Sequence, residues 1–226
     1  VGRLRVALVS TVGFALLPQW LRGFRGLYPQ VRVELTEATG DVQLQAFAAD
    51  EIDAGFMLHA TGFAPAGLAR HRIAQEPLVL ALPEQHPLAT AATLKLDAVL
   101  AEPLVIFPRR IVPSLFDAIF ALYHAAGHSP QVAQEAIQMQ TIVNLVSAGL
   151  GVAWVPESVR QFQRPGVVYR ALDKPGRGGK SGKPGKGLEV PGCETSLVWR
   201  EGGVNPSLER FIGFVRDQPG DDAGLV

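Results

Sequence analysis

The sequence lacks the features that mark several large classes of protein. Its 226 residues include a single cysteine, Cys193, so an intrachain disulfide is impossible. No run of 18 or more apolar residues occurs, so we expect no transmembrane helix. Lys plus Arg number 21 and Asp plus Glu also number 21, so no charge excess favours a nucleic-acid surface spread over the whole chain. Together these absences favour a globular protein of a reducing compartment, the cytoplasm, with no membrane partner.

Residues suited to catalysis or metal binding are scattered rather than clustered. His124 and His128 have the spacing of a ligand pair on one helix face, but Gly127 is expected to end that helix between them. Cys193 has no histidine near it in sequence, and no pair of carboxylates stands out. The sequence therefore predicts no enzyme, no metal site and no cofactor.

One segment, 173–192, differs in composition from the rest of the chain. Gly, Pro and Lys dominate it, and we expect a flexible loop over 173–193. It contains "GGKS", which resembles part of a phosphate-binding loop. The full motif needs glycine at position 174, which is Lys174, and a following helix, which Pro184 and Gly185 would prevent. A solvated basic loop is the better interpretation.

Elsewhere, short β-branched runs alternate with stretches of helical periodicity. Strands are expected over 3–10, 31–35, 52–58, 78–83, 103–107, 131–136, 152–156, 167–172 and 195–201, and helices over 15–27, 41–50, 113–126, 140–148 and 205–217. Such alternation predicts an α/β fold with mostly parallel sheets. We expect two Rossmann-like lobes.

The order of these elements predicts the division of the chain. Lobe I comprises 1–74, lobe II comprises 75–168, and 169–226 returns to lobe I. Two crossing segments, near 73–77 and 167–172, would join the lobes, which would then face each other across a cleft. The strand at the start of the chain suggests a piece of a longer protein or a processed chain.

Polar groups gather where strands give way to helices, which is where parallel α/β sheets bind ligands. The residues at three such junctions are Ser10, Thr11, Thr39, Gly40, Met139, Gln140 and Thr141. Helix N-termini have free N–H groups, so three that converge would form an anion site. At any single junction, helix capping worth about 1 kcal/mol is the simpler explanation. Their repetition favours a ligand.

A further cluster follows the strand at 103–107 in the other lobe. Arg109 and Arg110 could make forked contacts with a carboxylate, although ordinary surface arginines are equally compatible with the sequence. Phe107, Phe14 and Met139 are candidates for an apolar wall around the ligand, whereas Val152 fits a plain core position better.

At these residues the chain resembles a known family. The segments "LRVALVSTVGFALLPQWLRGFRGLYPQVRVEL", "PLVLALPEQHPLA" and "QMQTIVNLVSAGLGVAWVPES" are similar, in this order and spacing, to the effector-binding domain of LysR-type transcriptional regulators. The resemblance covers nearly the whole chain except 173–193. It implies two lobes of the periplasmic-binding-protein type II, with a small effector in the cleft and self-association to a dimer or tetramer. It also implies an N-terminal winged helix-turn-helix, absent from this chain, through which alone operator DNA would be bound.

The segment "IFPRRIVPSLFDAIFALYHAAGHSP" is most similar to regulators of aromatic-compound breakdown, whose effectors are small carboxylates such as muconate. By this resemblance, Ser10 corresponds to the first effector-contacting position. Gly40 stands where that subgroup often has threonine, and Thr39 lies one residue earlier. The resemblance thus implies an effector-sensing domain that binds a small anionic inducer and changes lobe orientation to control transcription.

A stand-alone periplasmic solute-binding protein for a small anion is the alternative function. It would share the fold and the cleft. A DNA-binding segment upstream in the full-length gene would exclude it, as would self-association, because transport receptors are usually monomers.

Overall fold

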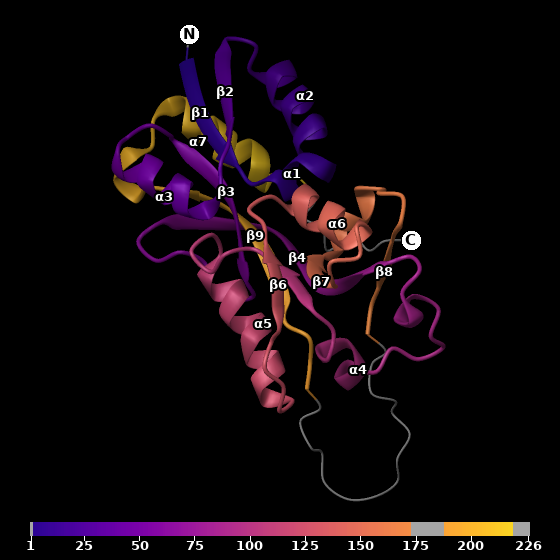
Figure 1. The fold of residues 1–226 in the computed structure, drawn as a ribbon. Helices are drawn as coiled ribbons and strands as arrows, with labels where there is room; N and C mark the ends of the chain where they lie inside the picture. The colour runs from indigo at the N-terminus through magenta and orange to yellow at the C-terminus, as the bar shows by residue number, and fades with distance from the viewer. Residues whose placement is uncertain (1, 173–187, 219–226) are drawn as a thin grey trace, which may run out of the picture. The chain divides into compact units, whose positions relative to one another are not determined.

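A computed structural model describes residues 2–172 and 188–218 of the chain (Figure 1). The "GGKS" motif lies outside the described residues. Contacts between Cα atoms divide the chain into two units. Unit 1 comprises Val1–Glu76, Arg110–Val112 and Cys193–Val226, and unit 2 comprises Pro77–Arg109 and Pro113–Gly192. The return to the first unit therefore lies at residue 193, whereas the sequence analysis placed it at 169.

Unit 1 alternates strands and helices, as the sequence predicts. Its elements are β1 (Gly2–Leu8), α1 (Ser10–Ala15), α2 (Leu17–Leu27), β2 (Val31–Glu37), α3 (Gly40–Ala48), β3 (Ala54–Ala60), β9 (Gly192–Trp199), the 3₁₀ turn η3 (Glu201–Gly203) and α7 (Pro206–Arg216). Strand β4 (Ala69–Pro83) begins in unit 1 and continues into unit 2. The helix expected over 15–27 is thus two helices, and the first of them begins at Ser10.

The sheet of unit 1 is parallel on the side that begins with β2. Strand β1 pairs in parallel with β2 and with β3, while β9 pairs antiparallel to β3 and also neighbours β4. The expectation of a mostly parallel sheet therefore holds for β1, β2 and β3 but not for β9. Parallel pairing brings the carboxyl ends of these three strands to one edge of the sheet.

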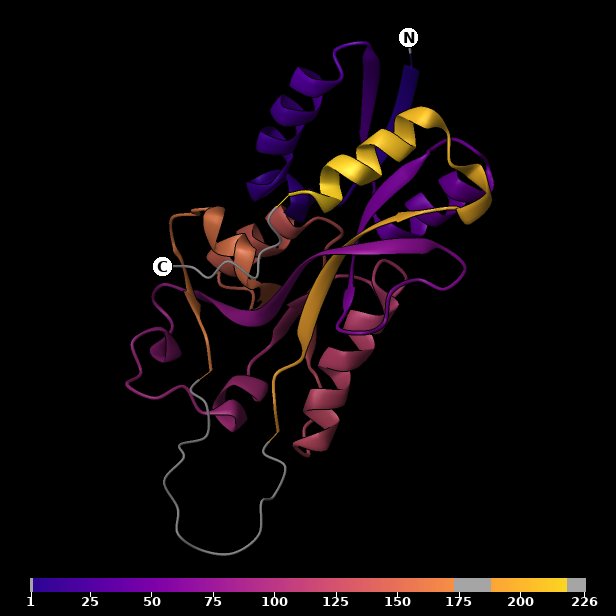
Figure 2. The same cartoon turned by 180° about the vertical axis from the view of Figure 1, so that it is seen from behind.

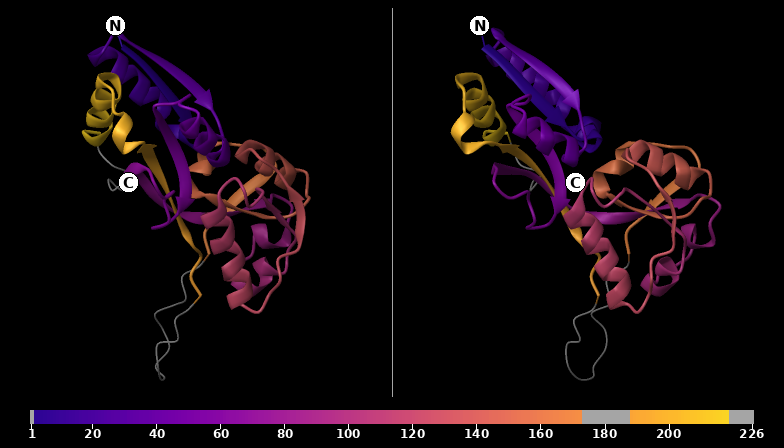
Figure 3. Two further views of the ribbon diagram at one scale, coloured as in Figure 1. Left: turned by 90° about the vertical axis from the view of Figure 1, so that its left-hand side faces the viewer. Right: turned by 60° about the vertical axis from the view of Figure 1, so that its left-hand side comes forward.

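Two cores cover the two faces of this sheet. Alternate residues of β1, such as Leu4 and Leu8, pack with α2 and α7, which lie beside each other on one face (Figure 2). Phe24 of α2 meets the ring of Phe211 of α7 edge to face at 5.1 Å between centroids. Helix α3 covers the other face (Figure 3), where its Phe47 packs with Met57. Burial of both faces accounts for the continuous apolar run Val6–Leu8 at the end of β1 and for the mostly apolar sequence of β3.

Unit 2 forms a second α/β assembly. Its remaining elements are η1 (Pro87–Ala89), α4 (Leu96–Leu100), β5 (Leu104–Ile106), α5 (Pro113–Ala125), β6 (Val132–Glu135), α6 (Met139–Ser147), β7 (Ala153–Pro156), η2 (Glu157–Gln161) and β8 (Val167–Arg170). The second half of β4 pairs antiparallel with β7 and β8, and β5 pairs in parallel with β6. Helix α4 was not expected from the sequence.

Two sequence expectations about strands were wrong. Strand β4 begins at Ala69, so residues 69–77 form a strand rather than a simple connection. Strand β9 begins at Gly192, so Cys193 lies in a buried strand and not in the Gly-rich loop. Burial raises the pKa of the Cys193 thiol well above its usual value, which makes the thiolate scarce and the side chain unreactive.

A buried polar cluster joins β3 to β9 on the face that α3 covers. His59 is 2% exposed; its Nδ1 lies 2.9 Å from the carbonyl oxygen of Ala60, and its Nε2 lies 2.9 Å from the hydroxyl of Ser196. The carboxylate of Glu194, directly across the strand pair, lies 3.8 Å from Nδ1. Burial lowers the pKa of His59 and outweighs the nearby carboxylate. The imidazole is therefore held neutral at pH 7.

No helix in residues 2–172 and 188–218 is long and apolar enough to cross a membrane.

The close approach of Gln43 to Gly55 gives a prediction about stability. A Cβ on Gly55 would lie 2.2 Å from Oε1 of Gln43, whose Nε2 already donates to the carbonyls of Ala38 and Phe56. Gly55→Ala should therefore destabilise the fold by about 1–3 kcal/mol in urea unfolding. Gly26→Ala is the matched control, because nothing lies within 4 Å of its added Cβ in the helix and it should be neutral or stabilising by up to ~1 kcal/mol. Equal losses in both variants would contradict this account.

The lowered pKa of His59 predicts how stability depends on pH. The unfolded chain takes up a proton on this imidazole near pH 6.5, whereas the folded chain does so only at lower pH. His59 therefore contributes stability that is fully present above about pH 6.5 and is lost as the pH falls below it. Urea unfolding between pH 7.5 and 5 should show a steeper loss for the wild type than for His59→Gln. An identical slope in the two proteins would exclude His59 as the cause.

Candidate functional site

The first strand-to-helix junction presents two hydroxyls that cap nothing. Helix α1 begins at Ser10, its N-cap residue is Val9, and no side chain caps it. Ser10 and Thr11 are both at least nine-tenths buried, and Oγ1 of Thr11 has no hydrogen-bond partner among the described residues. Capping, the simpler explanation of these hydroxyls, therefore does not hold at this junction. With only six residues, α1 contributes hydroxyls here rather than a strong helix dipole.

The second junction, between β2 and α3, is arranged differently. Thr39 is the N-cap residue of α3, but its hydroxyl donates to Oδ1 of Asp41 at 2.5 Å and not to a backbone amide. Gly40 is buried, and a Cβ at that position would lie 2.8 Å from the carbonyl oxygen of Ile111. A threonine side chain at position 40 would meet that carbonyl, which explains why glycine stands there.

These two junctions lie at one edge of the unit 1 sheet. Leu8 is level with Glu37 in the parallel pair, and the amide of Ala38 donates to the carbonyl of Leu8 at 3.0 Å. The chain then enters α1 at Ser10 and α3 at Gly40. Neighbouring strands are about 4.8 Å apart, so the two junctions are neighbours within unit 1.

The third junction belongs to unit 2. Helix α6 begins at Met139, with Gln138 as its N-cap residue and no side-chain cap. Met139 is buried and Thr141 is exposed, while Oε1 of Gln140 is buried without a hydrogen-bond partner in the described part of the chain. This junction, too, leaves its first-turn amides free of side-chain caps.

The two arginines already have carboxylate partners. In unit 2, Arg109 binds both oxygens of Asp117 through Nε and Nη2, at 2.7 and 2.6 Å, and these hydrogen bonds lower the pKa of the Asp117 carboxyl. In unit 1, Nε of Arg110 lies 3.6 Å from Oδ2 of Asp41. Because both arginines are well exposed, neither ion pair holds its arginine firmly.

The apolar candidates divide between wall and core. Phe107 is 4% exposed, and its ring packs against Phe116 at 6.4 Å between centroids. Val152 is fully buried, which fits its interpretation as a core residue. The side chain of Phe14 lies outside the described residues.

The predicted site residues therefore form two groups, one in each unit. Unit 1 brings Ser10, Thr11, Thr39, Gly40 and Arg110 to one edge of its sheet, and unit 2 carries Phe107, Arg109, Met139, Gln140 and Thr141.

Sequence analysis did not identify the acidic partners. Asp41 and Asp117, together with the carbonyl of Ile111, set the charge and the hydrogen-bonding character around these residues. Asp41 carried a signal, an acidic residue in the first helical turn, whereas the pairing of Arg109 with Asp117 had none.

The structure also bears on whether the described residues could bind a metal ion. Among residues 2–172 and 188–218, no three His, Cys, Asp or Glu side chains are placed to share a metal ion. Helix α5 ends at Ala125, and Gly127 follows in the left-handed region with φ +78°, so His124 and His128 do not share a helix face.

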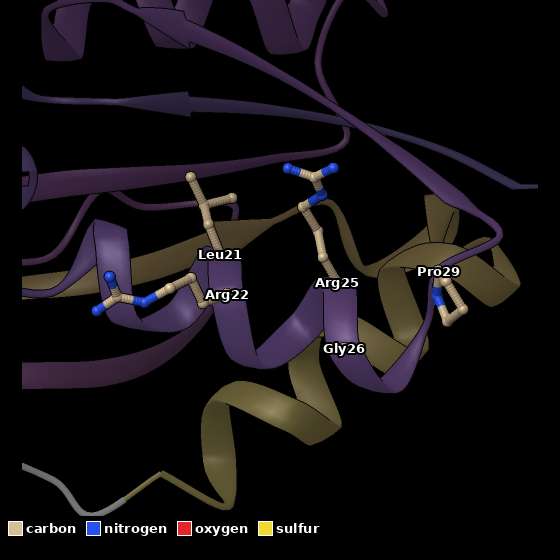
Figure 4. Close-up of a pocket in the computed structure, with 5 residues that line it drawn as sticks. All are labelled: Leu21, Arg22, Arg25, Gly26 and Pro29. Atoms are coloured by element: carbon tan, nitrogen blue, oxygen red, sulfur yellow. The ribbon is translucent and has the colours of Figure 1, made fainter.

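A groove lies along α2 in unit 1. It is lined by Leu21, Arg22, Arg25, Gly26 and Pro29 (Figure 4). Leu21 and Arg25 point to the same side of the helix, toward the neighbouring strand, and Arg22 points away. None of the predicted site residues lines this groove, so it is separate from the junctions described above.

Comparisons with known proteins agree on a single family. The family model described as the LysR substrate binding domain matches residues 1–220. The HTH-type transcriptional regulator IlvR of Caulobacter vibrioides is 38% identical over 217 residues, which are 96% of this chain and 68% of that protein. The regulator AlsR of Bacillus subtilis is 31% identical over 211 residues, or 93% of this chain and 65% of that protein. The chain thus spans about two thirds of these relatives.

Solved structures show the same fold. The LysR family regulator CbnR is 30% identical, with a TM-score of 0.70 over 95% of this chain and 69% of that one. The effector-binding domain of BenM, solved with its effector benzoate, has a TM-score of 0.71 at 22% identity over 97% of this chain and 96% of that one. The expected α/β fold is confirmed, and the relatives are regulators rather than enzymes. The chain therefore belongs to the LysR family of transcriptional regulators, as the family's substrate-binding domain.

Proposed function

We propose that this chain senses a small effector that carries a carboxylate, and that Ser10 and Thr11 at the first junction of unit 1 bind that carboxylate. The observation that carries the proposal is the absence of a side-chain cap at α1, together with the buried, unpartnered hydroxyl of Thr11. Buried donors without partners are costly, by about 1–3 kcal/mol each. An acceptor group from a ligand would remove that cost.

The energetics require several contacts to act together. A helix N-terminus contributes about 0.3–1 kcal/mol to an anion, and the best partly buried cases reach ~2. Micromolar affinity needs roughly 8 kcal/mol. The hydroxyls of Ser10 and Thr11 must therefore be joined by further polar and apolar contacts with the effector.

The effector would act by population shift. A ligand that binds one conformation of the domain tenfold better than another shifts their equilibrium by about 1.4 kcal/mol. In the whole protein, we propose that this shift controls transcription in the cytoplasm. The protein would self-associate to a dimer or tetramer and bind operator DNA through a winged helix-turn-helix that is not part of this chain.

A thermal-shift screen against aromatic and dicarboxylic acids, amino acids and their amine-free analogues tests the proposal. A ligand present at a hundred times its dissociation constant adds about 2.7 kcal/mol to the free energy of unfolding. For a domain of this size, that gain raises Tm by about 5–10 °C. If every compound at 10 mM leaves Tm unchanged, the proposal is wrong.

Substitution of Ser10 gives the residue-level prediction. Ser10→Ala removes one hydroxyl that caps nothing, so it should weaken binding of the screened effector about tenfold while Tm without effector stays within 2 °C. Calorimetric titration measures the affinity, and Ser129→Ala, at an exposed position, is the matched control. Unchanged affinity in Ser10→Ala would remove Ser10 from the site.

A further inference from the structure

The charges around the predicted site are already balanced before any ligand arrives. Arg109 is engaged by both carboxylate oxygens of Asp117, and Arg110 faces Asp41 at 3.6 Å. Neither arginine is therefore an unopposed cation. Within unit 1, a dicarboxylate effector would have to separate Arg110 from Asp41 to obtain a counter-charge. Asp41 thus disfavours an effector with two negative charges.

The start of α3 carries the more informative of these aspartates. Asp41 lies in the first turn of the helix, where a carboxylate is stabilised by the helix dipole. Its side chain is 24% exposed, so it is accessible from solvent. Its carboxylate accepts a hydrogen bond from Thr39, and its partner Arg110 is 59% exposed, with Nε 3.6 Å from Oδ2. The pairing can therefore be exchanged for another cation.

A second acceptor lies at the same junction. The carbonyl oxygen of Ile111 lies 2.8 Å from the point where a Cβ of Gly40 would be. The hydroxyl of Thr39 already donates its hydrogen bond to Asp41. A carboxylate and a carbonyl thus occupy the start of α3, and the nearby hydroxyl offers no free donor. This chemistry suits a ligand group that donates hydrogen bonds and carries positive charge, such as a protonated amine.

The junction between β1 and α1 offers a hydrogen-bond donor instead of acceptors. Ser10 and Thr11 follow β1, which pairs in parallel with β2, so they lie at the same edge of the unit 1 sheet as the start of α3. Oγ1 of Thr11 is a nine-tenths buried donor without a partner in the described chain. An acceptor such as a carboxylate would satisfy it. One edge of one sheet thus presents both a carboxylate acceptor, Asp41, and the unpartnered hydroxyl of Thr11.

We propose that the effector is a zwitterion of the α-amino acid class, whose ammonium group binds Asp41 and whose carboxylate binds Ser10 and Thr11. The inference rests on the proposed function and adds the chemical class of the ligand. Asp41 is then the residue that selects this class, because it attracts the ammonium group and repels any second carboxylate. A single substitution at position 41 should change which compounds bind.

The test uses matched pairs of compounds on the wild-type chain. Leucine and phenylalanine are compared by calorimetry with 4-methylpentanoate and 3-phenylpropanoate, which lack the amine, and with muconate as the dicarboxylate. We expect at least one of the two amino acids to bind ten times or more tighter than its amine-free partner. Muconate should bind more weakly than that amino acid and more weakly than its amine-free partner.

Variants at position 41 then assign the preference to its charge. Asp41→Asn should reduce the tenfold preference for the amine to less than twofold, whereas Asp41→Glu should retain it. Asp97→Asn is the matched control, since Asp97 is a well-exposed aspartate on α4. The melting temperature of each variant without ligand identifies any loss that arises from unfolding.

Three results would overturn the inference in distinguishable ways. Amine-free acids that bind as tightly as the amino acids, with affinity that still depends on Ser10, would refute the zwitterion and leave the proposed function standing. Failure of every compound of both classes to bind at millimolar concentration would contradict the inference and the proposed function together. A preference for the amine that survives in Asp41→Asn would show that another residue selects it.

Discussion

The parallel pairing of β1 with β2 and β3 is the constraint from which the candidate site of unit 1 follows. In a parallel pair, all carboxyl ends meet at one edge, and the connection to the next strand must begin there. Helices α1 and α3 therefore both start at this edge, although they are distant in sequence and pack on opposite faces of the sheet. The core of α2 and α7 on one face and α3 on the other holds this register, because a slip of one residue would expose Leu4, Val6 and Leu8.

Within that geometry, charge decides which ligands fit. Hydroxyls and amides alone would make the edge a general anion site, as the sequence suggests. The structure adds Asp41 in the first turn of α3 and a carbonyl against Gly40, which make half of the edge an acceptor. Arg110 compensates Asp41 only at ion-pair distance and from an exposed position. The site that we propose therefore combines an acceptor, Asp41, with a donor, the hydroxyl of Thr11, at one edge of the sheet.

Much of the fold followed from sequence because burial imposes a clear period. Strand β1 and helix α2 have strong apolar patterns, and both were expected near their observed positions. The first half of β4 was missed because its polar residues, such as Arg72, alternate with a buried Ile73 and read as a connection. Cys193 was assigned to the loop because glycine and proline precede it, although β9 begins at Gly192 and is buried along almost its whole length. Tertiary pairing with β3, which sequence does not reveal, makes it a strand.

The junctions of the site could be predicted for a related reason, and their electrostatics could not. Strand ends are visible in sequence, so Ser10, Thr11 and Thr39 were expected at these junctions, and the structure places them there. The partners of Arg109 and Arg110 depend on how the chain returns past α3 and α5, and no local pattern encodes that return. The steric role of Gly40 likewise depends on Ile111, which reaches it only in the folded chain. The sequence thus indicated the hydrogen-bond donors at the junctions. Only the structure revealed the acceptors beside them, which are Asp41, Asp117 and the carbonyl of Ile111.

The hydroxyls of Ser10 and Thr11 at the first junction do not stabilise the fold by capping a helix, and this favours a role in ligand binding. A serine at the N-cap stabilises a helix by about 1 kcal/mol relative to an aliphatic residue, yet the cap of α1 is Val9 and Ser10 comes one position too late. Thr11 is then buried with its hydroxyl unpartnered, which adds a cost of about 1–3 kcal/mol. Both costs fall at the same place, and both concern donors. A bound acceptor at this position would recover the second of them, so ligand binding and the stability of unit 1 are necessarily coupled.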